Sequence, residues 1–282
     1  GRASRDWLNV QHDMLRMFSE FVGEDVPVSS LTKKHVREFK EKLFELPAKA
    51  KQMKEFEGLT FNQIVEKNKK LGKPTVSRRR INAMLSAVQM FVKWCVNHGY
   101  METNIVEGQT VPQDKDATER KSFSTDQLNT LFQSPLFRGC KSDKFISRPG
   151  DHLVRDHRYW APLIALFSGA RLGEIVQLDV ADIEKREDGG WAFRFVDDAK
   201  GEKRLKSKAA RRVVPIHNEL VRLGLIEHVE KQRKAKNTKL FPGIKPDNRG
   251  FLSGPMSQRF NQYLNTIGVK QPGLVFHSFR HT

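Results

Sequence analysis

Two short segments far apart in the chain hold the residues best suited to chemistry. Residues 168–174 read Ser-Gly-Ala-Arg-Leu-Gly-Glu, and residues 277–282 read His-Ser-Phe-Arg-His-Thr. Arg171 and Arg280 each offer a planar fork of donors that fits phosphate oxygens and stays charged at any working pH. Two such forks on one phosphodiester would stabilise the extra negative charge that develops when phosphorus is attacked. His277 lies one helical turn before Arg280, so both side chains can face the same ligand.

Plainer explanations exist for these residues. Arg171 follows an apolar run and precedes another, so its neighbours would bury it and it needs an acceptor. A structural salt bridge to Glu174 or Asp179 would satisfy that need. An isolated His-x-x-Arg pair occurs often by chance, so the assignment of His277 depends mainly on the sequence around it.

The pattern Gly-x-Arg-x-x-Glu followed by a distant His-x-x-Arg-His resembles the tyrosine recombinase family, the phage-type integrases. Residues 168–178 match the family's first arginine motif along its whole length, and residues 274–282 match the start of the family's second arginine motif. The resemblance implies that Arg171 and Arg280 clamp the scissile phosphate and that Glu174 orients Arg171. It also implies that His277 takes part in proton transfer, a task suited to imidazole near neutral pH.

The resemblance further implies a lysine general acid on a β-hairpin, which protonates the departing 5′ oxygen. The polar stretch 197–210 is the predicted hairpin loop, and its lysines compete for this role: Lys200, Lys203, Lys206 and Lys208. Residues 206–215 are similar to the family's K-T-x-x-S-x-R-x-V-P stretch, which favours Lys206, with Lys208 as the alternative. Ala210 stands where that pattern has serine. The plainer interpretation is that these lysines are solvated charges that touch phosphate without specificity.

No tyrosine follows the second arginine motif, where the family has its nucleophile. Tyr100, Tyr159 and Tyr263 all precede it, in contexts typical of core or helix surface. We therefore assign no nucleophile in this chain and expect a catalytic domain that is incomplete at its C-terminus and unable to cleave as given. The chain starts at Gly1 rather than Met, which suggests a trimmed N-terminus.

Composition favours a polyanionic partner. The chain has 282 residues, a formal net charge of +17 and a pI near 9.9, and such an excess is typical of nucleic-acid binding. Apolar residues make up 38 %, too many for a disordered chain. Cys95 and Cys140 resemble reduced thiols of a cytoplasmic protein. No stretch approaches the roughly 18 apolar residues of a membrane span. His152 and His157 lack further ligands at metal spacing, so we expect neither a metal nor a cofactor.

The first hundred residues predict helices alone, the later ones beginning near Thr32, near Thr60 and after Pro74. The predicted inward residues recur mostly at three- and four-residue steps: Trp7, Val10, Met14, Leu15, Phe18 and Phe21 in the first helix, and Ile81, Leu85, Val88, Met90, Phe91, Trp94 and Cys95 in the fourth. The fourth helix opens with Arg78, Arg79 and Arg80, and the second with Lys33 and Lys34. The backbone amides at a helix start attract phosphate, so these basic residues are candidate DNA-binding residues. The alternative is that they are solvated residues of basic turns.

A second domain begins where Ser124 and Gln127 form a capping-box pattern. Its predicted elements are helices over 159–167, 218–234 and 256–267 and strands over 191–196 and 211–216. The predicted fold class is mainly α with a small antiparallel β-sheet. We expect a helical core-binding domain at 1–105, a linker at 106–122 and a mixed α+β catalytic domain at 123–282.

The resemblance implies a site-specific DNA recombinase that cleaves and rejoins strands through a 3′-phosphotyrosine intermediate. Its implied partner is duplex DNA, which the two domains would surround as a clamp, in the bacterial cytoplasm at the nucleoid. The intact protein would form a synaptic tetramer, and this chain a monomer without membrane contact. The alternatives are a type IB topoisomerase, which shares the catalytic constellation, and a DNA-binding protein that holds sites without cutting.

Overall fold

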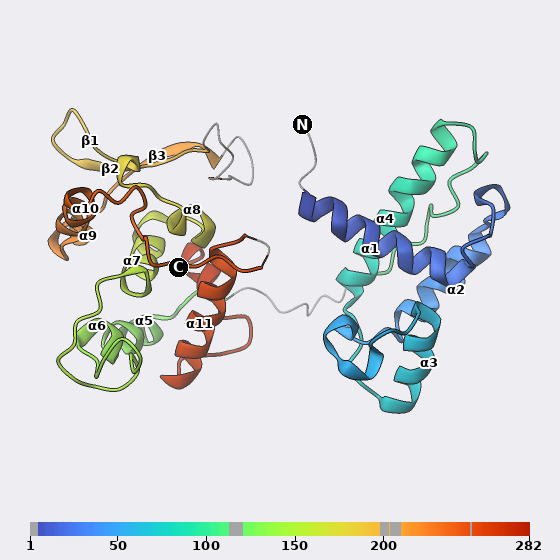
Figure 1. Cartoon of the computed structure of the whole chain (residues 1–282), viewed down its shortest axis with the longest axis horizontal. Helices are drawn as coiled ribbons and strands as arrows, with labels where there is room; N and C mark the ends of the chain where they lie inside the picture. The colour runs from blue at the N-terminus through green and yellow to red at the C-terminus, as the bar shows by residue number, and fades with distance from the viewer. Residues whose placement is uncertain (1–4, 113–120, 198–202, 204–209, 249) are drawn as a thin grey trace. The chain divides into compact units, whose positions relative to one another are not determined.

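Two separate hydrophobic cores divide the chain. The computed structural model describes residues 5–112, 121–197, 203, 210–248 and 250–282. The chain splits into two units, residues 1–117 and 118–282, and each has its own set of buried apolar side chains (Figure 1).

The first unit is built from helices. They are α1 (Arg5–Val22), α2 (Lys33–Leu43), α3 (Phe61–Leu71) and α4 (Arg78–Asn97), with 3₁₀ turns at Val28–Ser30, Ala50–Gln52 and Lys54–Phe56. Thr32 and Thr60 head α2 and α3 in capping boxes, and Ser77 accepts a hydrogen bond from the Arg80 amide at 3.3 Å. The caps lie where the sequence predicts helix starts, because a short side-chain oxygen satisfies an amide that the first turn leaves without a partner.

The two long helices bury narrower stripes than the sequence suggests. Trp7, Val10, Met90 and Trp94 were predicted inward, but each side chain is 41–51 % exposed. At about 100° per residue, Met90 lies about 160° and Trp94 about 120° around α4 from Val88, so both fall outside the buried stripe. The Trp94 ring stacks instead on His98 and Tyr100 outside the core.

The segment after α4 belongs to the first core as far as Val111. Ile105, Val106 and Val111 are each 5 % exposed. The Asn82 side chain bonds the Val111 backbone twice, donating to its carbonyl at 2.8 Å and accepting from its amide at 2.9 Å. The predicted linker at 106–122 includes Val106 and Val111, because the polar residues around them obscure their apolar pattern in the sequence.

The second unit combines helices with one small sheet. Its helices are α5 (Thr125–Phe132), α6 (Pro135–Arg138), α7 (His157–Ser168), α8 (Leu172–Val176), α9 (Asn218–Arg222), α10 (Leu225–Lys234) and α11 (Ser253–Thr266), with 3₁₀ turns η4 (Val180–Asp182) and η6 (Phe276–Arg280). Its strands are β1 (Ile183–Lys185), β2 (Trp191–Phe195) and β3 (Arg212–Pro215). The sheet lies at one end of the unit, α5 and α6 lie at the other, and α7 and α8 lie between them (Figure 1).

The sheet is antiparallel in the order β1-β2-β3, so Phe193 pairs with Ile183 on one side and with Val214 on the other. The predicted fold class is confirmed, together with both predicted strands. The sequence missed β1, because three residues are too few to show an alternation. It also predicted one helix over 218–234, which the structure divides at Gly224, where φ is 94°.

Helix α7 is the centre of the second core. Trp160 and Ile164 are at most 1 % exposed, and nearly every turn of α7 is buried. The helix ends at Gly169, whose φ of 61° reverses the chain at little cost because glycine has no Cβ. This turn delivers the next residues, the first arginine segment, to the surface of the core. Among the described residues, no helix combines the length and apolarity needed to cross a membrane.

We predict that a glutamate-specific protease cuts the native chain after Glu119 and spares Glu107. Glu107 lies in a segment held to the first core on both sides, whereas residues 113–121 are polar and without hydrophobic periodicity. Mass spectrometry of the early fragments checks this. Cleavage after Glu107 at the same rate would contradict the assignment of residues 101–111 to the first core.

Candidate functional site

The first arginine segment is a tight turn between two helices. After Gly169, Arg171 serves as N-cap of α8, and its carbonyl accepts from the amides of Glu174 at 2.9 Å and Ile175 at 3.1 Å. The Ser168 hydroxyl accepts from the Ala170 amide at 3.2 Å. The backbone of Arg171 is therefore fixed on both sides of its side chain.

Glu174 is the buried acceptor that Arg171 needs. The Glu174 side chain is 4 % exposed, whereas that of Arg171 is 35 % exposed. Arg171 donates to it twice, from its amide to Oε2 at 3.0 Å and from Nη1 to Oε1 at 2.8 Å. Of the two salt bridges that the sequence left open, the one with Glu174 is made. Because Arg171 gives one guanidinium nitrogen to Glu174 and keeps 35 % of its side chain exposed, this pairing is compatible with phosphate binding.

Arg212 is the second cation on Glu174, and the sequence analysis missed it. Its Nη2 lies 2.8 Å from Oε2 of Glu174. Burial alone would raise the pKa of Glu174, but hydrogen bonds from Arg212 and Arg171 outweigh it and hold that pKa below its ordinary value. The sequence signal that could have identified Arg212 is its place as the arginine of the R-x-V-P stretch. Arg212 is the first residue of strand β3.

Arg280 brings the second segment to the first. Its Nη1 donates to the carbonyl of Gly169 at 3.0 Å, across 111 residues of sequence. Gly169 is two positions before Arg171, so the two arginine segments meet in the folded chain. Arg280 is exposed, as a ligand for an external phosphate must be.

A 3₁₀ turn rather than an α-helix holds His277 and Arg280. Both lie in η6, and because residues three apart eclipse in this geometry, they share a face. Fully buried Ser278 accepts from the Val275 amide at 3.1 Å and fixes the start of the turn. Phe276 and Phe279, each 2 % exposed, anchor the turn in the aromatic core.

The end of the chain is tied back to the beginning of the second unit. The Ser122 hydroxyl donates to the His281 carbonyl at 2.6 Å, and the Phe123 amide donates to the Thr282 hydroxyl at 3.0 Å. The ring of His281 lies 5.2 Å from that of His277, measured between centroids. These contacts support a structural part for residue 281.

The hairpin lysines divide into one that is described and three that are not. Lys200, Lys206 and Lys208 lie outside the described residues, so the assignment of the general acid stays a prediction. Lys203 is 7 % exposed and pairs with Asp179 at 2.8 Å and Asp182 at 2.9 Å. Burial lowers the pKa of Lys203, but both carboxylates outweigh it and raise that pKa. These contacts give Lys203 a structural role instead.

The basic residues predicted to bind DNA in the first unit all lie at helix starts. Arg78, Arg79 and Arg80 are exposed in the first turn of α4, and Lys33 and Lys34 are exposed in the first turn of α2. Arg78 also donates to the Pro112 carbonyl at 3.3 Å. The placement suits phosphate contacts, since amides at a helix start also attract anions.

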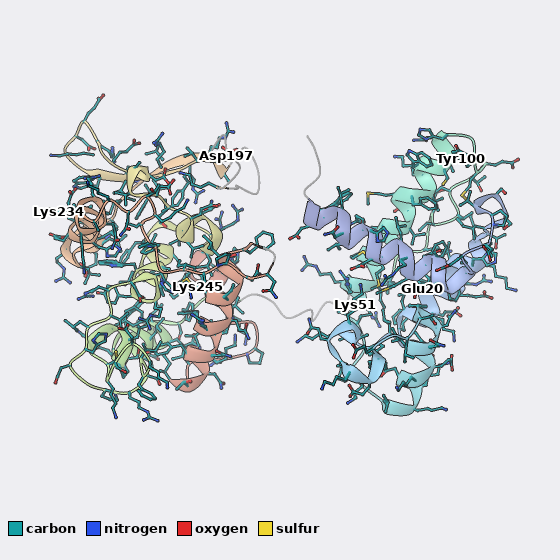
Figure 2. The ribbon with its side chains drawn as sticks, viewed as in Figure 1. Glu20, Lys51, Tyr100, Asp197, Lys234 and Lys245 are labelled. Carbon is teal, nitrogen blue, oxygen red and sulfur yellow. The ribbon has the colours of Figure 1, made fainter. Side chains whose placement is uncertain are left out.

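The three tyrosines have structural surroundings. Tyr263 is 6 % exposed, and its hydroxyl lies 2.6 Å from Ser134 Oγ and accepts from the Leu136 amide at 3.2 Å. Burial raises the pKa of Tyr263 despite these bonds. Tyr159 is 4 % exposed, with Arg155 over its ring. Tyr100 follows α4 in the first unit (Figure 2). Within the described part of the chain, no three His, Cys, Asp or Glu side chains are grouped as metal ligands would be.

Comparison with known proteins finds similarity in structure alone. No protein-family model matches the sequence, and no curated protein matches it. The chain is similar to a lambda integrase (75–356) dimer bound to a COC′ core site, with 14 % identity, 99 % of this chain and 78 % of that chain covered, and a TM-score of 0.57. It is also similar to the Tn1549 transposon integrase in complex with transposon right-end DNA, with 14 % identity, coverage of 100 % and 80 %, and a TM-score of 0.61.

A third match is a lambda integrase tetramer bound to a Holliday junction, with 13 % identity, coverage of 99 % and 66 %, and a TM-score of 0.59. At these identities the likeness is one of fold. The chain therefore has the fold of these phage and transposon integrases, as the tyrosine recombinase resemblance implied.

We predict that Glu174→Gln destabilises the chain by about 3 kcal/mol at pH 7, because two guanidinium groups lose their shared buried carboxylate. The pKa of Glu174 is lowered in the folded state, so its contribution is present above the unfolded pKa and is lost as pH falls through the folded pKa. Urea unfolding between pH 7 and pH 3 should show the two proteins converging in acid.

Glu184→Gln is the matched control. Glu184 is 44 % exposed beside Arg194 at 3.5 Å, and its loss should cost about 0.5 kcal/mol or less at every pH. A Glu174→Gln deficit that stays constant down to pH 3 would contradict the ion-pair account.

Proposed function

We propose that this chain is the core-binding and catalytic part of a site-specific DNA recombinase of the tyrosine type. The observation that carries the proposal is the hydrogen bond from Arg280 to the carbonyl of Gly169, which unites the two arginine segments. An exposed Arg280 and a half-buried Arg171 fixed by a buried carboxylate suit the binding of a single phosphodiester.

The proposed chemistry is transfer of a DNA strand to a tyrosine. The tyrosine oxygen attacks phosphorus, the bond to the 5′ oxygen breaks, and a 3′-phosphotyrosine and a 5′-hydroxyl result. Arg171 and Arg280 neutralise the charge that develops on the non-bridging oxygens, and His277 assists proton transfer. Lys206, or Lys208 in its place, supplies the proton of the 5′-hydroxyl. The reverse reaction with a partner strand rejoins the DNA, so neither metal nor nucleotide is consumed.

Duplex DNA is the proposed partner. The matching lambda integrases are a dimer on a core site and a tetramer on a Holliday junction, and the Tn1549 integrase is in complex with transposon right-end DNA. The net charge of +17 and the arginines and lysines at the starts of α4 and α2 support the same partner here. A synaptic tetramer of the intact recombinase is part of the proposal, as is activity in the bacterial cytoplasm at the nucleoid.

A binding role without cleavage is the second candidate, and the tyrosines favour it for the 282-residue chain. Tyr263 and Tyr159 are buried, and Tyr100 stacks on Trp94 in the first unit. The Tyr263 hydroxyl is bonded to Ser134 and to the Leu136 amide inside the second core. The two candidate functions use the same phosphate site and differ in whether the protein becomes covalently joined to DNA. Trapping of a covalent adduct therefore distinguishes them.

We predict that the chain binds duplex DNA with a steep salt dependence. With about six to ten phosphate contacts, affinity should fall about a thousandfold or more between 50 and 200 mM salt, because bound counterions are released. Arg171→Ala and Arg280→Ala should each reduce the slope of log affinity against log salt by about one. Fluorescence anisotropy at several salt concentrations measures both effects.

Arg222→Ala is the control, because Arg222 is 72 % exposed and paired with Glu219 at 2.5 Å. A flat salt response would contradict DNA binding by a basic surface. Slopes for Arg171→Ala and Arg280→Ala that equal the control's would contradict the phosphate site.

We also predict that the 282-residue chain forms no covalent adduct with DNA. A nucleophile must give up its proton, and burial among neutral partners raises the pKa of Tyr263. Incubation with a nicked suicide substrate and denaturing electrophoresis would detect an adduct. An adduct lost on Tyr263→Phe would make Tyr263 the nucleophile and contradict our account of its hydroxyl.

A further inference from the structure

Arg212 and Arg171 share one buried carboxylate. Oε2 of Glu174 accepts from Arg212 Nη2 at 2.8 Å and from the Arg171 amide at 3.0 Å, while Oε1 accepts from Arg171 Nη1 at 2.8 Å. The Glu174 side chain is 4 % exposed, so water does little to screen these contacts. Strand β3 and helix α8 are thus joined through one side chain.

Three further contacts make Arg212 a rigid partner. As the first residue of β3, it pairs with Phe195 of β2. Its guanidinium carbon lies 4.6 Å from the centre of the Phe195 ring, and that ring is 2 % exposed. Its Nη1 donates to the carbonyl of Ala210 at 2.9 Å. Little side-chain entropy therefore remains for Arg212 to lose when it holds Glu174.

The charge balance of the cluster depends on Arg212. Two guanidinium groups and one carboxylate leave a net charge of +1 beside the predicted phosphate position. Without Arg212, Glu174 would face Arg171 alone, and the two charges would cancel. The carboxylate would also be free to take a second donor of Arg171 in a bidentate pair. In the described structure Arg171 uses one guanidinium nitrogen, Nη1, on Glu174.

We propose that Arg212 is a positioning residue for Arg171: by sharing Glu174, it keeps one edge of the Arg171 guanidinium open to phosphate and keeps the cluster positively charged. The inference deepens the proposed function and rests on it for the identity of the ligand. The effect of Arg212 on Arg171 is independent of the proposed function, because the contacts through Glu174 are present in the free chain.

The test compares four variants of the 282-residue chain. Arg212→Met keeps the apolar stem on Phe195 and removes the charge, whereas Arg212→Lys keeps the charge. Arg211→Met is the matched control, because Arg211 is adjacent in sequence, is 57 % exposed and pairs with Asp197 at 2.6 Å, beyond the end of β2 (Figure 2). It lowers the net charge by the same one unit. Arg171→Met identifies the signal of Arg171 and shows how much phosphate binding the site provides.

Two measurements keep the inference and the proposed function apart. In the free chain, ¹⁵N NMR of the arginine Nε–Hε groups should show the Arg171 signal displaced in Arg212→Met and unchanged in Arg211→Met. On titration with inorganic phosphate, Arg212→Met should weaken binding about tenfold, the loss expected when a charged hydrogen bond that orders the site is removed. Arg212→Lys should restore affinity to within about threefold, because the net charge is kept.

An Arg171 signal and a phosphate affinity in Arg212→Met that match Arg211→Met would overturn the inference. If Arg212→Met fails to fold, Arg212→Lys decides: a folded lysine variant that binds phosphate as weakly as Arg171→Met would overturn the charge-sharing role. If Arg171→Met itself binds phosphate as the unmodified chain does, the proposed function fails. In that case the response of the Arg171 signal to Arg212→Met still decides the inference.

Discussion

The buried carboxylate of Glu174 is the interaction on which the site depends. A carboxylate removed from water is costly unless it is fully hydrogen-bonded and paired. Glu174 meets this condition with an amide and two guanidinium groups, drawn from α8 and from β3. Its burial therefore fixes Arg171, which would otherwise be a flexible surface side chain, and joins the sheet to the turn after α7.

The rest of the second core supports this arrangement from two sides. Helix α7 is buried along most of its length and ends at Gly169, which supplies both the turn to Arg171 and the carbonyl that accepts from Arg280. The turn that holds Arg280 is anchored by Phe276 and Phe279 among other aromatic rings. Rigid apolar packing thus positions two charged side chains that face outward, which is the arrangement expected of a site whose ligand comes from solvent.

A second buried ion-pair cluster lies in the same unit, around Lys203. Lys203 is buried between Asp179 and Asp182, and Lys239 lies 2.9 Å from the second oxygen of Asp179. Asp179 and Asp182 belong to the segment that follows α8, just as Glu174 belongs to α8 itself. The stretch 171–182 is therefore paired with cations at two points, Lys203 at Asp179 and Asp182 and Arg212 at Glu174. Such paired contacts limit how far the strand and the arginine turn can shift relative to each other.

Features that depend on near neighbours could be predicted from the sequence. Capping residues such as Thr32 and Ser124, the apolar run of α7 and the glycine before Arg171 act within a few positions, so they predict helices, their starts and the first arginine turn. The predicted class, mainly α with a small antiparallel sheet, follows from the same local patterns. The residue types and spacing of the two arginine segments likewise identified Arg171, Glu174, His277 and Arg280 as the candidate site.

The buried faces of the helices and the contacts between distant groups depend on the packing of the whole fold. Met90 and Trp94 are apolar and yet exposed, because the packing of α4 has room for one stripe only. Arg280 reaches Gly169 across 111 residues, and Arg212 reaches Glu174 across 38. No local pattern encodes such contacts. The buried carboxylate of Glu174 must find its partners wherever the folded chain brings them, and the turn that holds Arg280 meets Gly169 because the aromatic core anchors that turn beside the end of α7.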